Sequence, residues 1–389
     1  MADITLEERV EGMKDFIEKN EQHMLKLLDQ LVNIDSGTYV KHGVDQVGKV
    51  LREVYEAIGF EAVTYKQENL GNNIVIKHPE AKNPRIVMIA HMDTVFPEGT
   101  VSKRPFKIDG DYAYGPGVID MKGSHVTTFY ALKALMESGD EAYKDIVLIL
   151  NSDEEIGSVG SRPLIEDVAK DKKYALILEP AQNGNLVSRR KGGGKYFLKV
   201  NGKAAHAGMN PDIGISAIEE LAGKILKLHQ LARPEEGLYM NVGVIKGGTS
   251  INTIAPSAEA AIDVRIDTEK QGIEINQAIK EVTSTSDVAG TKLELTGSIT
   301  RPAWELTEAS EALIQKITEE GEKLGLSLKH EKSGGGSDGN ITGYVGIPTV
   351  DGLGPMGGGA HAESEYLYIP SLTERTLLLA NVIKKLAEA

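Results

Sequence analysis

The sequence predicts an α/β protein in which a sheet with helical crossovers carries a second, inserted α+β domain. Three five-residue apolar runs, each followed directly by polar side chains, alternate with amphipathic stretches; the runs are Ile86–Ala90, Ile146–Leu150 and Tyr174–Leu178. Such runs are typical of central strands buried on both faces, and their alternation with helices favours an α/β sheet. After about residue 190 the order changes to βαββαβ, a split pattern typical of ferredoxin-like domains.

The segment before residue 190 supplies most of the larger domain. Apolar side chains at helical spacing predict one or two helices in the first 35 residues and another helix over 44–58. Short β-rich runs follow at 62–65 and 73–76, and Asp109-Gly110 between two short strands predicts a hairpin. Residues 121–136, between the first two apolar runs, are predicted to form a helix.

The inserted domain begins within KGGG at 191–194, which we expect to be a flexible, glycine-rich stretch. A strand follows, and the remaining predicted elements are a helix at 215–231, strands at 238–245 and 258–266, a helix at 273–282 and a strand at 292–299. A helix at 310–324 resumes the larger domain. The predicted division is therefore 1–191 and 303–389 for the larger domain and 192–302 for the insert.

Composition excludes several classes of function. The 389 residues include 57 acidic and 43 basic side chains, a formal net charge of -14, which disfavours nucleic acid or an anionic membrane as a partner. Without cysteine there is no disulfide, thiolate metal site or cysteine nucleophile. No apolar run approaches the length of a membrane span, and the N-terminal residues lack the pattern of a secretory signal. A cytoplasmic protein is expected.

The residues that follow the three apolar runs are able to bind metal. His91 and Asp93 follow the first run, Glu154 and Glu155 the second, and Glu179 the third. Ligands of open α/β sheets bind beyond the carboxyl ends of the strands, so these groups are expected in one crevice. Each of them, taken alone, could equally be a solvated residue at the start of a loop.

Two further residues complete a possible site. Asp120, in GPGVIDMKGSH, precedes a helix and could simply cap it, and His361, in GGGAHAESEY, could be a solvated loop histidine. Together with His91, Glu154, Glu155 and Glu179, however, they supply two imidazoles and four carboxylates, enough for a pair of divalent cations. The other histidines lie outside recognisable motifs and are treated as background; they are residues 23, 42, 78, 125, 229 and 330.

At this point the sequence resembles a known family, the co-catalytic zinc exopeptidases and deacylases. The strings AHMDTV, GVIDMKGS, DEEIGS, EPA, HAG, GGTSINTIAP, DVR, RPA, GGGSDGN and HAESEY occur in the family's order from about 86 to 370. That family includes glutamate carboxypeptidase, peptidase T, succinyl-diaminopimelate desuccinylase and acetylornithine deacetylase, and RPA and GGGSDGN are most similar to the first. The resemblance implies a phosphorylase/hydrolase-like di-zinc catalytic domain with an inserted ferredoxin-like dimerisation or lid domain.

The resemblance also implies a role for each residue of the site. His91 and Glu179 would bind one zinc, Glu155 and His361 the other, and Asp120 would bridge them, with Co²⁺ or Mn²⁺ as possible substitutes. The carboxylate of Asp93 would fix the tautomer of His91 and raise its basicity, and Glu154 would be the general base that activates a bridging water. A cis peptide bond is expected after Asp120.

In the insert, the resemblance implies that His206 donates a hydrogen bond to the oxyanion. In the family this histidine often comes from the other subunit of a dimer. Asn252, Arg265, Arg301 and the loop at Gly335 match positions that hold the substrate, and arginine suits a carboxylate through its bidentate fork. From the residues alone, His206 could be an ordinary loop histidine and Arg265 could pair with Asp263 or Asp267. GGGSDGN could present N–H groups to a carboxylate or be a plain connection.

We therefore predict a zinc metallopeptidase of the carboxypeptidase type. It would cleave the amide bond next to a free carboxylate in short peptides or N-acyl amino acids. A deacylase of the acetylornithine deacetylase or desuccinylase type is the alternative, and a non-catalytic binding protein is a third. A homodimer formed through the insert is expected, because two strand edges and apolar helix positions at Ile218, Leu221 and Ile225 could pair between subunits.

Overall fold

The computed structural model describes residues 6–388 of the chain, with side chains from residue 10 onward. Contacts within the chain divide it into two compact units. Unit 1 comprises 1–189, 306–333 and 337–389, and unit 2 comprises 190–305 and 334–336. None of the described helices is long and apolar enough to cross a membrane.

Unit 1 is built on a six-stranded sheet in the order β1-β2-β6-β3-β7-β14. These strands are β1 Glu61–Tyr65, β2 Asn73–Lys77, β3 Ile86–His91, β6 Ile146–Asn151, β7 Tyr174–Ile177 and β14 Thr349–Val350. The three predicted apolar runs form β6, β3 and β7, which lie side by side and parallel and are buried along their whole length. The prediction of an α/β sheet with buried central strands is confirmed.

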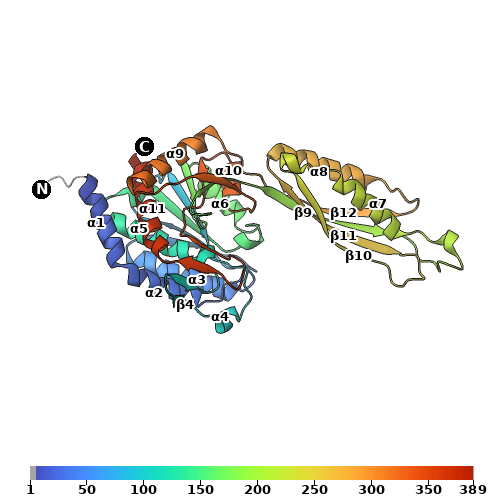
Figure 1. Ribbon diagram of the computed structural model, residues 1–389, viewed down its shortest axis with the longest axis horizontal. Coiled ribbons are helices and arrows are strands. Elements are labelled where there is room, and N and C mark those ends of the chain that lie inside the picture. Colours follow the sequence, from blue (N-terminus) through green and yellow to red (C-terminus); the bar gives the residue numbers. More distant parts are fainter. Residues whose placement is uncertain (1–5, 389) are drawn as a thin grey trace. The chain divides into compact units, whose positions relative to one another are not determined.

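Helices cover both faces of this sheet (Figure 1). One face packs against α1 Leu6–Lys19, α2 Glu21–Val32, α3 Lys41–Ala57, α5 Gly123–Glu137, α9 Glu308–Lys323 and α11 Pro370–Glu388. The other packs against α6 Arg162–Ala169 and α10 Gly339–Tyr344. Since side chains of a strand alternate between faces, Met88 and Ala90 contribute to the first core and Val87 and Ile89 to the second.

Smaller elements complete unit 1. The predicted hairpin at Asp109-Gly110 is present, and Gly110 has the positive φ of 57° that such a turn requires. Its strands belong to a four-stranded antiparallel sheet made of β15 Gly357–Gly358, β16 Tyr366–Tyr368, β5 Tyr112–Tyr114 and β4 Lys107–Asp109. The remaining pieces are α4 Thr100–Lys103 and the paired strands β8 Leu186–Arg190 and β13 His330–Ser333.

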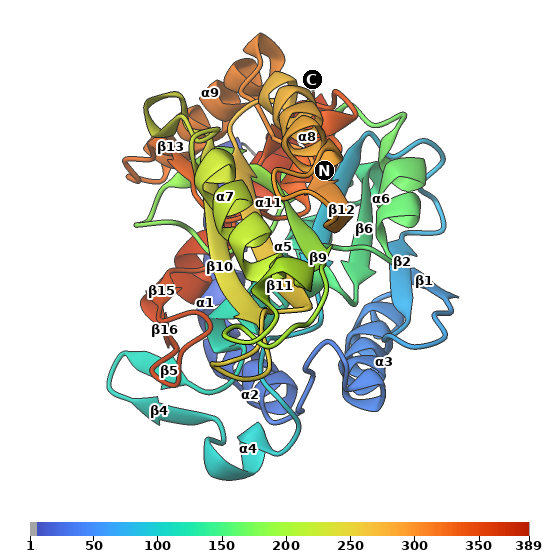
Figure 2. The same cartoon turned by 90° about the vertical axis from the view of Figure 1, so that its right-hand side faces the viewer.

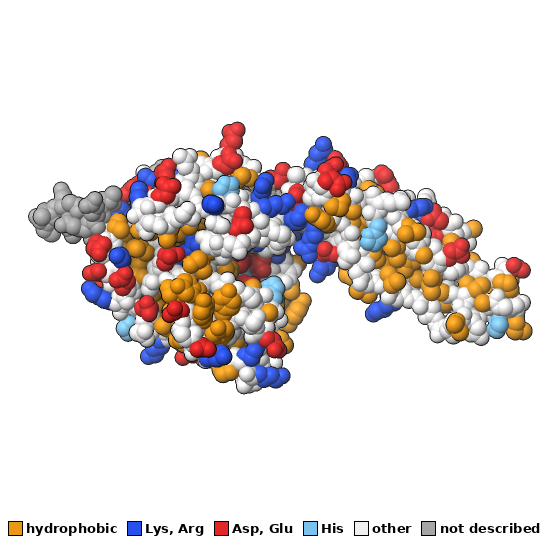
Figure 3. All heavy atoms as spheres, in the orientation of Figure 1, with side chains coloured by type: hydrophobic (Ala, Val, Ile, Leu, Met, Phe, Trp, Pro, Cys, Tyr) orange, Lys and Arg blue, Asp and Glu red, His pale blue; other side chains and the backbone are white. Residues whose placement is uncertain are grey.

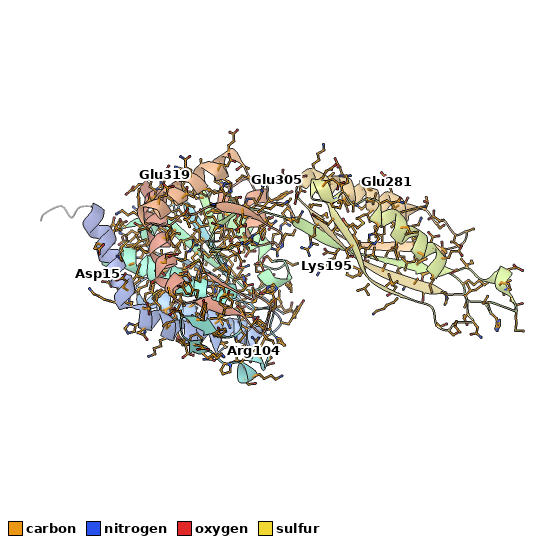
Figure 4. All side chains as sticks on the ribbon, in the orientation of Figure 1. Asp15, Arg104, Lys195, Glu281, Glu305 and Glu319 are labelled. Atoms are coloured by element: carbon orange, nitrogen blue, oxygen red, sulfur yellow. The ribbon has the colours of Figure 1, made fainter. Side chains whose placement is uncertain are left out.

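Unit 2 has the predicted βαββαβ order and an antiparallel sheet in the order β10-β11-β9-β12 (Figure 2). Its elements are β9 Gly192–Asn201, α7 Ala217–His229, β10 Tyr239–Gly247, β11 Ser257–Ile266, α8 Glu269–Ser284 and β12 Lys292–Arg301. The helices cover one face, and the alternation in β9 leaves Lys195 exposed on the other (Figure 4). A capping box at Thr268 and Gln271 begins α8.

Two expectations for unit 2 are wrong. Gly192, Gly193 and Gly194 are not a flexible stretch; they begin β9 and are buried. A Cβ atom on Gly194 would lie 2.1 Å from the carbonyl oxygen of Ser298 on the neighbouring strand, so glycine permits close strand packing there.

The apolar positions of α7 are also distributed differently from the expectation. Leu221 is buried and is therefore not available to a partner, whereas Ile225 is partly buried against the core of unit 2. Ile218 and Leu226 are the exposed large apolar side chains of this helix, at 47% and 68%. Figure 3 shows hydrophobic side chains on the surface of unit 2.

Candidate metal centre

The carboxyl ends of β3, β6 and β7 place the predicted ligands of unit 1 together. The strands are parallel and in register, so His91 at the end of β3 lies beside Asn151 at the end of β6. A short helical turn over Glu154–Ile156 follows β6, and Glu179 lies two residues beyond β7. Asp120 lies in an irregular turn, Val118–Lys122, directly before α5, and the expected cis peptide bond follows it.

Asp120 lies between two histidines, and each of its carboxylate oxygens faces one of them. Its Oδ1 is 3.1 Å from His91 Nε2, and its Oδ2 is 3.1 Å from His361 Nε2. His91 Nε2 is also 3.7 Å from Glu179 Oε1, and His361 Nε2 is 3.2 Å from Glu155 Oε2.

Two groups of three possible ligands therefore share Asp120. His91, Asp120 and Glu179 form one, and Asp120, Glu155 and His361 form the other; the ligand atoms within each group lie within 4.8 Å of one another. Three carboxylates and two imidazoles with one shared carboxylate form a donor set that fits two divalent cations.

Burial makes this cluster electrostatically unfavourable without cations. Burial raises the pKa of Glu155 to about 7 and raises the pKa of Glu179 well above its usual value, and the charge of Glu154 adds to both shifts. Glu155 Oε1 is buried and lacks a hydrogen-bond partner among the described residues. Buried carboxylates this close together repel one another, and bound cations would remove that cost.

Hydrogen bonds partly compensate the histidines and Asp120. Burial alone would lower the pKa of His91, but its bonds to Asp120 and Asp93 raise that pKa well above the usual value. Burial alone would raise the pKa of Asp120, but hydrogen bonds with His361 and His91 hold it below its usual value. Bonds to Asp120 and Glu155 raise the pKa of His361 to about 10.

Asp93 organises the loops around the cluster. Its carboxylate accepts the N–H groups of Glu154 at 3.1 Å and Glu155 at 3.3 Å, and the Thr38 hydroxyl at 2.7 Å. His91 Nδ1 lies 2.9 Å from the backbone oxygen of Asp93 and 3.4 Å from its carboxylate. The backbone oxygen is therefore the closer partner of Nδ1, and a bond there leaves Nε2 directed at Asp120 and Glu179.

The predicted residues of unit 2 form a separate set. The loops of His206 and Asn252 are joined, since Ala207 N–H donates to the Asn252 carbonyl at 3.0 Å. His206 is exposed, and its Nδ1 accepts the N–H groups of Gly208 and Met209, each at 3.1 Å. In neutral His206 the ring proton must therefore be on Nε2, which makes that atom a hydrogen-bond donor.

The arginines of unit 2 have partners within that unit. Arg265 pairs with Asp263, with Nε 2.9 Å from Oδ2, which is one of the pairings left open by the sequence. Arg301 runs alongside Gly336, where a Cβ atom would lie 2.4 Å from Arg301 Cδ. The Gly335 carbonyl accepts Arg190 Nη1 at 3.3 Å.

Two residues near the cluster were not identified from the sequence. His125, treated as background, is buried, and its Nε2 lies 2.7 Å from the His91 carbonyl oxygen. Glu365, fully buried, accepts backbone N–H groups of the turn that carries Asp120. His125 lies in the motif of Asp120, GVIDMKGSH, and Glu365 lies in the motif of His361, HAESEY. Closeness in sequence to a proposed ligand is the signal that could have identified both.

Comparisons with known proteins agree with these features. The model of a family described as Peptidase family M20/M25/M40 matches residues 87–385. Carboxypeptidase G2 of Pseudomonas sp. (strain RS-16) is 32% identical over 372 residues, 93% of this chain and 89% of that protein. Succinyl-diaminopimelate desuccinylase of Thioalkalivibrio sulfidiphilus is 26% identical over 386 residues, 93% of this chain and 98% of that protein. A tripeptidase structure from Staphylococcus aureus has a TM-score of 0.78 and 25% identity, covering 95% of this chain and 99% of its own.

Proposed function

Since the chain belongs to peptidase family M20/M25/M40, we propose that it is a metal-dependent carboxypeptidase that cleaves the amide bond next to a free carboxylate. The family is the one that the motifs resemble, so the predicted peptidase class is confirmed. Short peptides and N-acyl amino acids are the proposed substrates. The observation that carries the proposal is the pair of ligand groups that share Asp120.

His91 and Glu179 are the proposed ligands of one cation, Glu155 and His361 are those of the other, and Asp120 would be shared by both. The mixed imidazole and carboxylate set suits zinc, with Co²⁺ or Mn²⁺ as substitutes. When bound, the two ions would lower the pKa of a shared water and polarise the scissile carbonyl. The unpartnered Glu155 Oε1 supports this assignment.

Glu154 is the proposed general base. It follows Asp153 at the start of the turn after β6, is buried, and its charge acts on both Glu155 and Glu179. Its carboxylate would take a proton from the attacking water and deliver it to the leaving amine. Asp93 would fix the backbone of Glu154 and Glu155 through the two hydrogen bonds that it accepts from them.

Unit 2 would supply oxyanion stabilisation and substrate binding. The exposed Nε2–H of His206 is suited to donate to an oxyanion, and Asn252 lies on the adjoining loop. Arg301 is the proposed anchor of the substrate carboxylate, supported by the space that Gly336 leaves for its side chain. Arg265 and the Gly335 loop are proposed to line the same binding region.

We also propose that 192–302 acts as a dimerisation domain joining two copies of the chain. The edge strands β10 and β12 and the exposed Ile218 and Leu226 support this proposal. Supply of His206 from the partner copy would give the dimer a catalytic role. The cytoplasmic location stays a prediction from the sequence.

A deacylase remains the second candidate, supported by the 26% identity to succinyl-diaminopimelate desuccinylase. It would use the same ligands and base with different substrate contacts. The test is to assay zinc- and cobalt-loaded protein against N-blocked dipeptides ending in glutamate, against acetylornithine and against succinyl-diaminopimelate. Preferential release of C-terminal glutamate supports the carboxypeptidase, whereas preferential deacylation of the other two substrates contradicts it.

A further inference from the structure

Glu365 is a buried carboxylate outside the two ligand groups. Its relative exposure is 0%, and it directly precedes β16. Glu365 Oε2 accepts the N–H of Gly117 at 2.8 Å, and Oε1 accepts the N–H groups of Ile119 and Asp120, each at 3.0 Å. Three hydrogen bonds from one carboxylate thus hold the turn that presents Asp120, across 245 to 248 positions of sequence.

The turn held by Glu365 is one that needs external support. Gly117 has a positive φ of 73°, and the backbone of Asp120 and Met121 departs from helical geometry. The regular pattern of helical hydrogen bonds is therefore interrupted in the backbone at Asp120. The carboxylate of Glu365 supplies the missing acceptors.

Glu365 also closes the loop that carries His361. The N–H of Glu365 donates to the Ala362 carbonyl at 3.2 Å, and the N–H of Ala362 donates to the Gly359 carbonyl at 2.9 Å. His361 itself has a left-handed φ of 66° and its side chain is 56% exposed. One residue thus has its backbone in the His361 loop and its carboxylate on the Asp120 turn.

Arg104, labelled in Figure 4, supports the same loop from outside. Its Nη1 donates to the Glu363 carbonyl at 2.8 Å. This contact uses the backbone oxygen of Glu363 and not its carboxylate, and Glu363 is exposed. Glu363 is therefore a matched control position, with the same side chain on the same loop.

The two ligand groups differ in how they are supported. His91 and Glu179 extend from the carboxyl ends of β3 and β7, which are hydrogen bonded in register within the central sheet. His361 extends from a loop and reaches Asp120 Oδ2 at 3.1 Å. The group of Asp120, Glu155 and His361 therefore depends more on loop geometry than the group of His91, Asp120 and Glu179.

We propose that Glu365 is a positioning residue that sets Asp120 against His361 and so assembles the second metal site. This inference rests on the proposed function. Replacement by glutamine keeps the shape of the side chain but turns an amide N–H₂ toward at least one of the three backbone donors. The second ion then loses more affinity than the first, because the strands that carry the other two ligands of the first ion stay paired in the central sheet.

The test compares the full-length wild type with Glu365→Gln and Glu363→Gln. Zinc and cobalt affinities are measured by competition with a chromophoric chelator, and thermal unfolding of the metal-free proteins monitors folding. For Glu365→Gln we expect the second ion to bind about 10- to 100-fold more weakly, the usual effect of losing a group that orients a ligand. The affinity for the first ion should change much less than that for the second, and both affinities of Glu363→Gln should match those of the wild type.

A spectroscopic measurement separates positioning from general stability. In protein loaded with two Co²⁺ per chain, a carboxylate bridge couples the two spins, and electron paramagnetic resonance detects the coupling. Glu365→Gln is expected to show uncoupled Co²⁺. Glu365→Asp keeps the charge with a shorter reach and should show partial loss of second-ion affinity, which keeps the test available if the glutamine variant does not fold.

Unchanged affinity and coupling in the Glu365 variants would overturn the inference, as would equal weakening of both ions. If the wild type itself binds no pair of ions, the proposed function fails instead. The two failures are therefore distinguishable in one set of titrations.

Discussion

The proposed functional residues of unit 1 and those of unit 2 lie in opposite kinds of surroundings. In unit 1, His91, Asp120 and Glu179 are largely buried and lie at strand ends or in a turn fixed by other buried groups. In unit 2, His206, Asn252 and Arg265 are exposed, and their side chains bond to neighbouring backbone, to the Ser250 hydroxyl and to Asp263, respectively. The residues of unit 1 carry unfavourable buried charge, whereas those of unit 2 already have hydrogen-bond partners close to them in the sequence.

This contrast separates two requirements of a hydrolase. Cation binding and proton transfer need groups that are held in fixed positions and whose pKa values are shifted. A buried sheet edge provides both. Substrate recognition and oxyanion donation tolerate exposed loops that become desolvated only when substrate binds. Changes in unit 1 should therefore have larger effects than changes in unit 2.

Metal removal should produce the largest effect. Dialysis against a strong chelator should abolish hydrolysis and lower the free energy of unfolding, because the buried carboxylates then repel one another. A ligand that binds only the native state stabilises it by about 2.7 kcal/mol at 100 times its Kd. Calorimetry with and without added Zn²⁺ checks the stability effect; equal unfolding temperatures would contradict the electrostatic account.

Glu154→Gln tests the reactive part of the unit 1 set. We expect kcat to fall by about 10³- to 10⁴-fold with two ions still bound, because the amide cannot accept a proton. Metal content by atomic emission and steady-state kinetics are the measurements. The control is Glu166→Gln, a partly exposed acid on α6 that pairs with Arg162. Full activity of Glu154→Gln would exclude this residue as the base.

His206→Asn tests the unit 2 set, with a smaller expected loss of about 10² in kcat, the usual effect of one oxyanion donor. His229→Asn, at an exposed position in α7, is the matched control. Mixing inactive Glu154→Gln with His206→Asn protein should restore about a quarter of wild-type activity if subunits exchange randomly and His206 acts across a dimer. Activity that stays at the level of the separate variants would contradict action in trans.

The smallest predicted effect concerns the pH dependence of stability. Burial lowers the pKa of His125 to about 3, so it stays neutral in the folded protein while the unfolded chain gains a proton near pH 6.5. The unfolded state then binds more protons, and stability falls as the pH falls below about 6.5. Between pH 7.5 and 5.5 this single group contributes a loss of about 1.4 kcal/mol.

Urea unfolding at the two pH values measures this contribution. The pH-dependent loss should be smaller by that amount in His125→Asn, and the exposed His229→Asn should retain it. An identical loss in His125→Asn and wild type would show that the buried histidine does not control the slope.

The strands of both units were predictable because hydrophobic periodicity is local. The runs at 86–90 and 146–150 extend by only one residue in β3 and β6. The glycines at 192–194 predict a flexible stretch, because nothing in the local sequence reveals the neighbouring strand that approaches them. Leu221 differs from the prediction for the same reason, because an apolar helix face does not specify whether it packs within its own unit or against a partner.

The sequence by itself determined the alternation of elements, the acidic charge and the chemistry of the ligand set, because residue type and spacing carry that information directly. Only the tertiary structure decided which oxygens of Asp120 face which histidine, that Asp93 uses its backbone toward His91, and that Glu365 holds the Asp120 turn. Those relations join residues up to 248 positions apart. They depend on burial and distance, which arise only when the sheet edge is assembled.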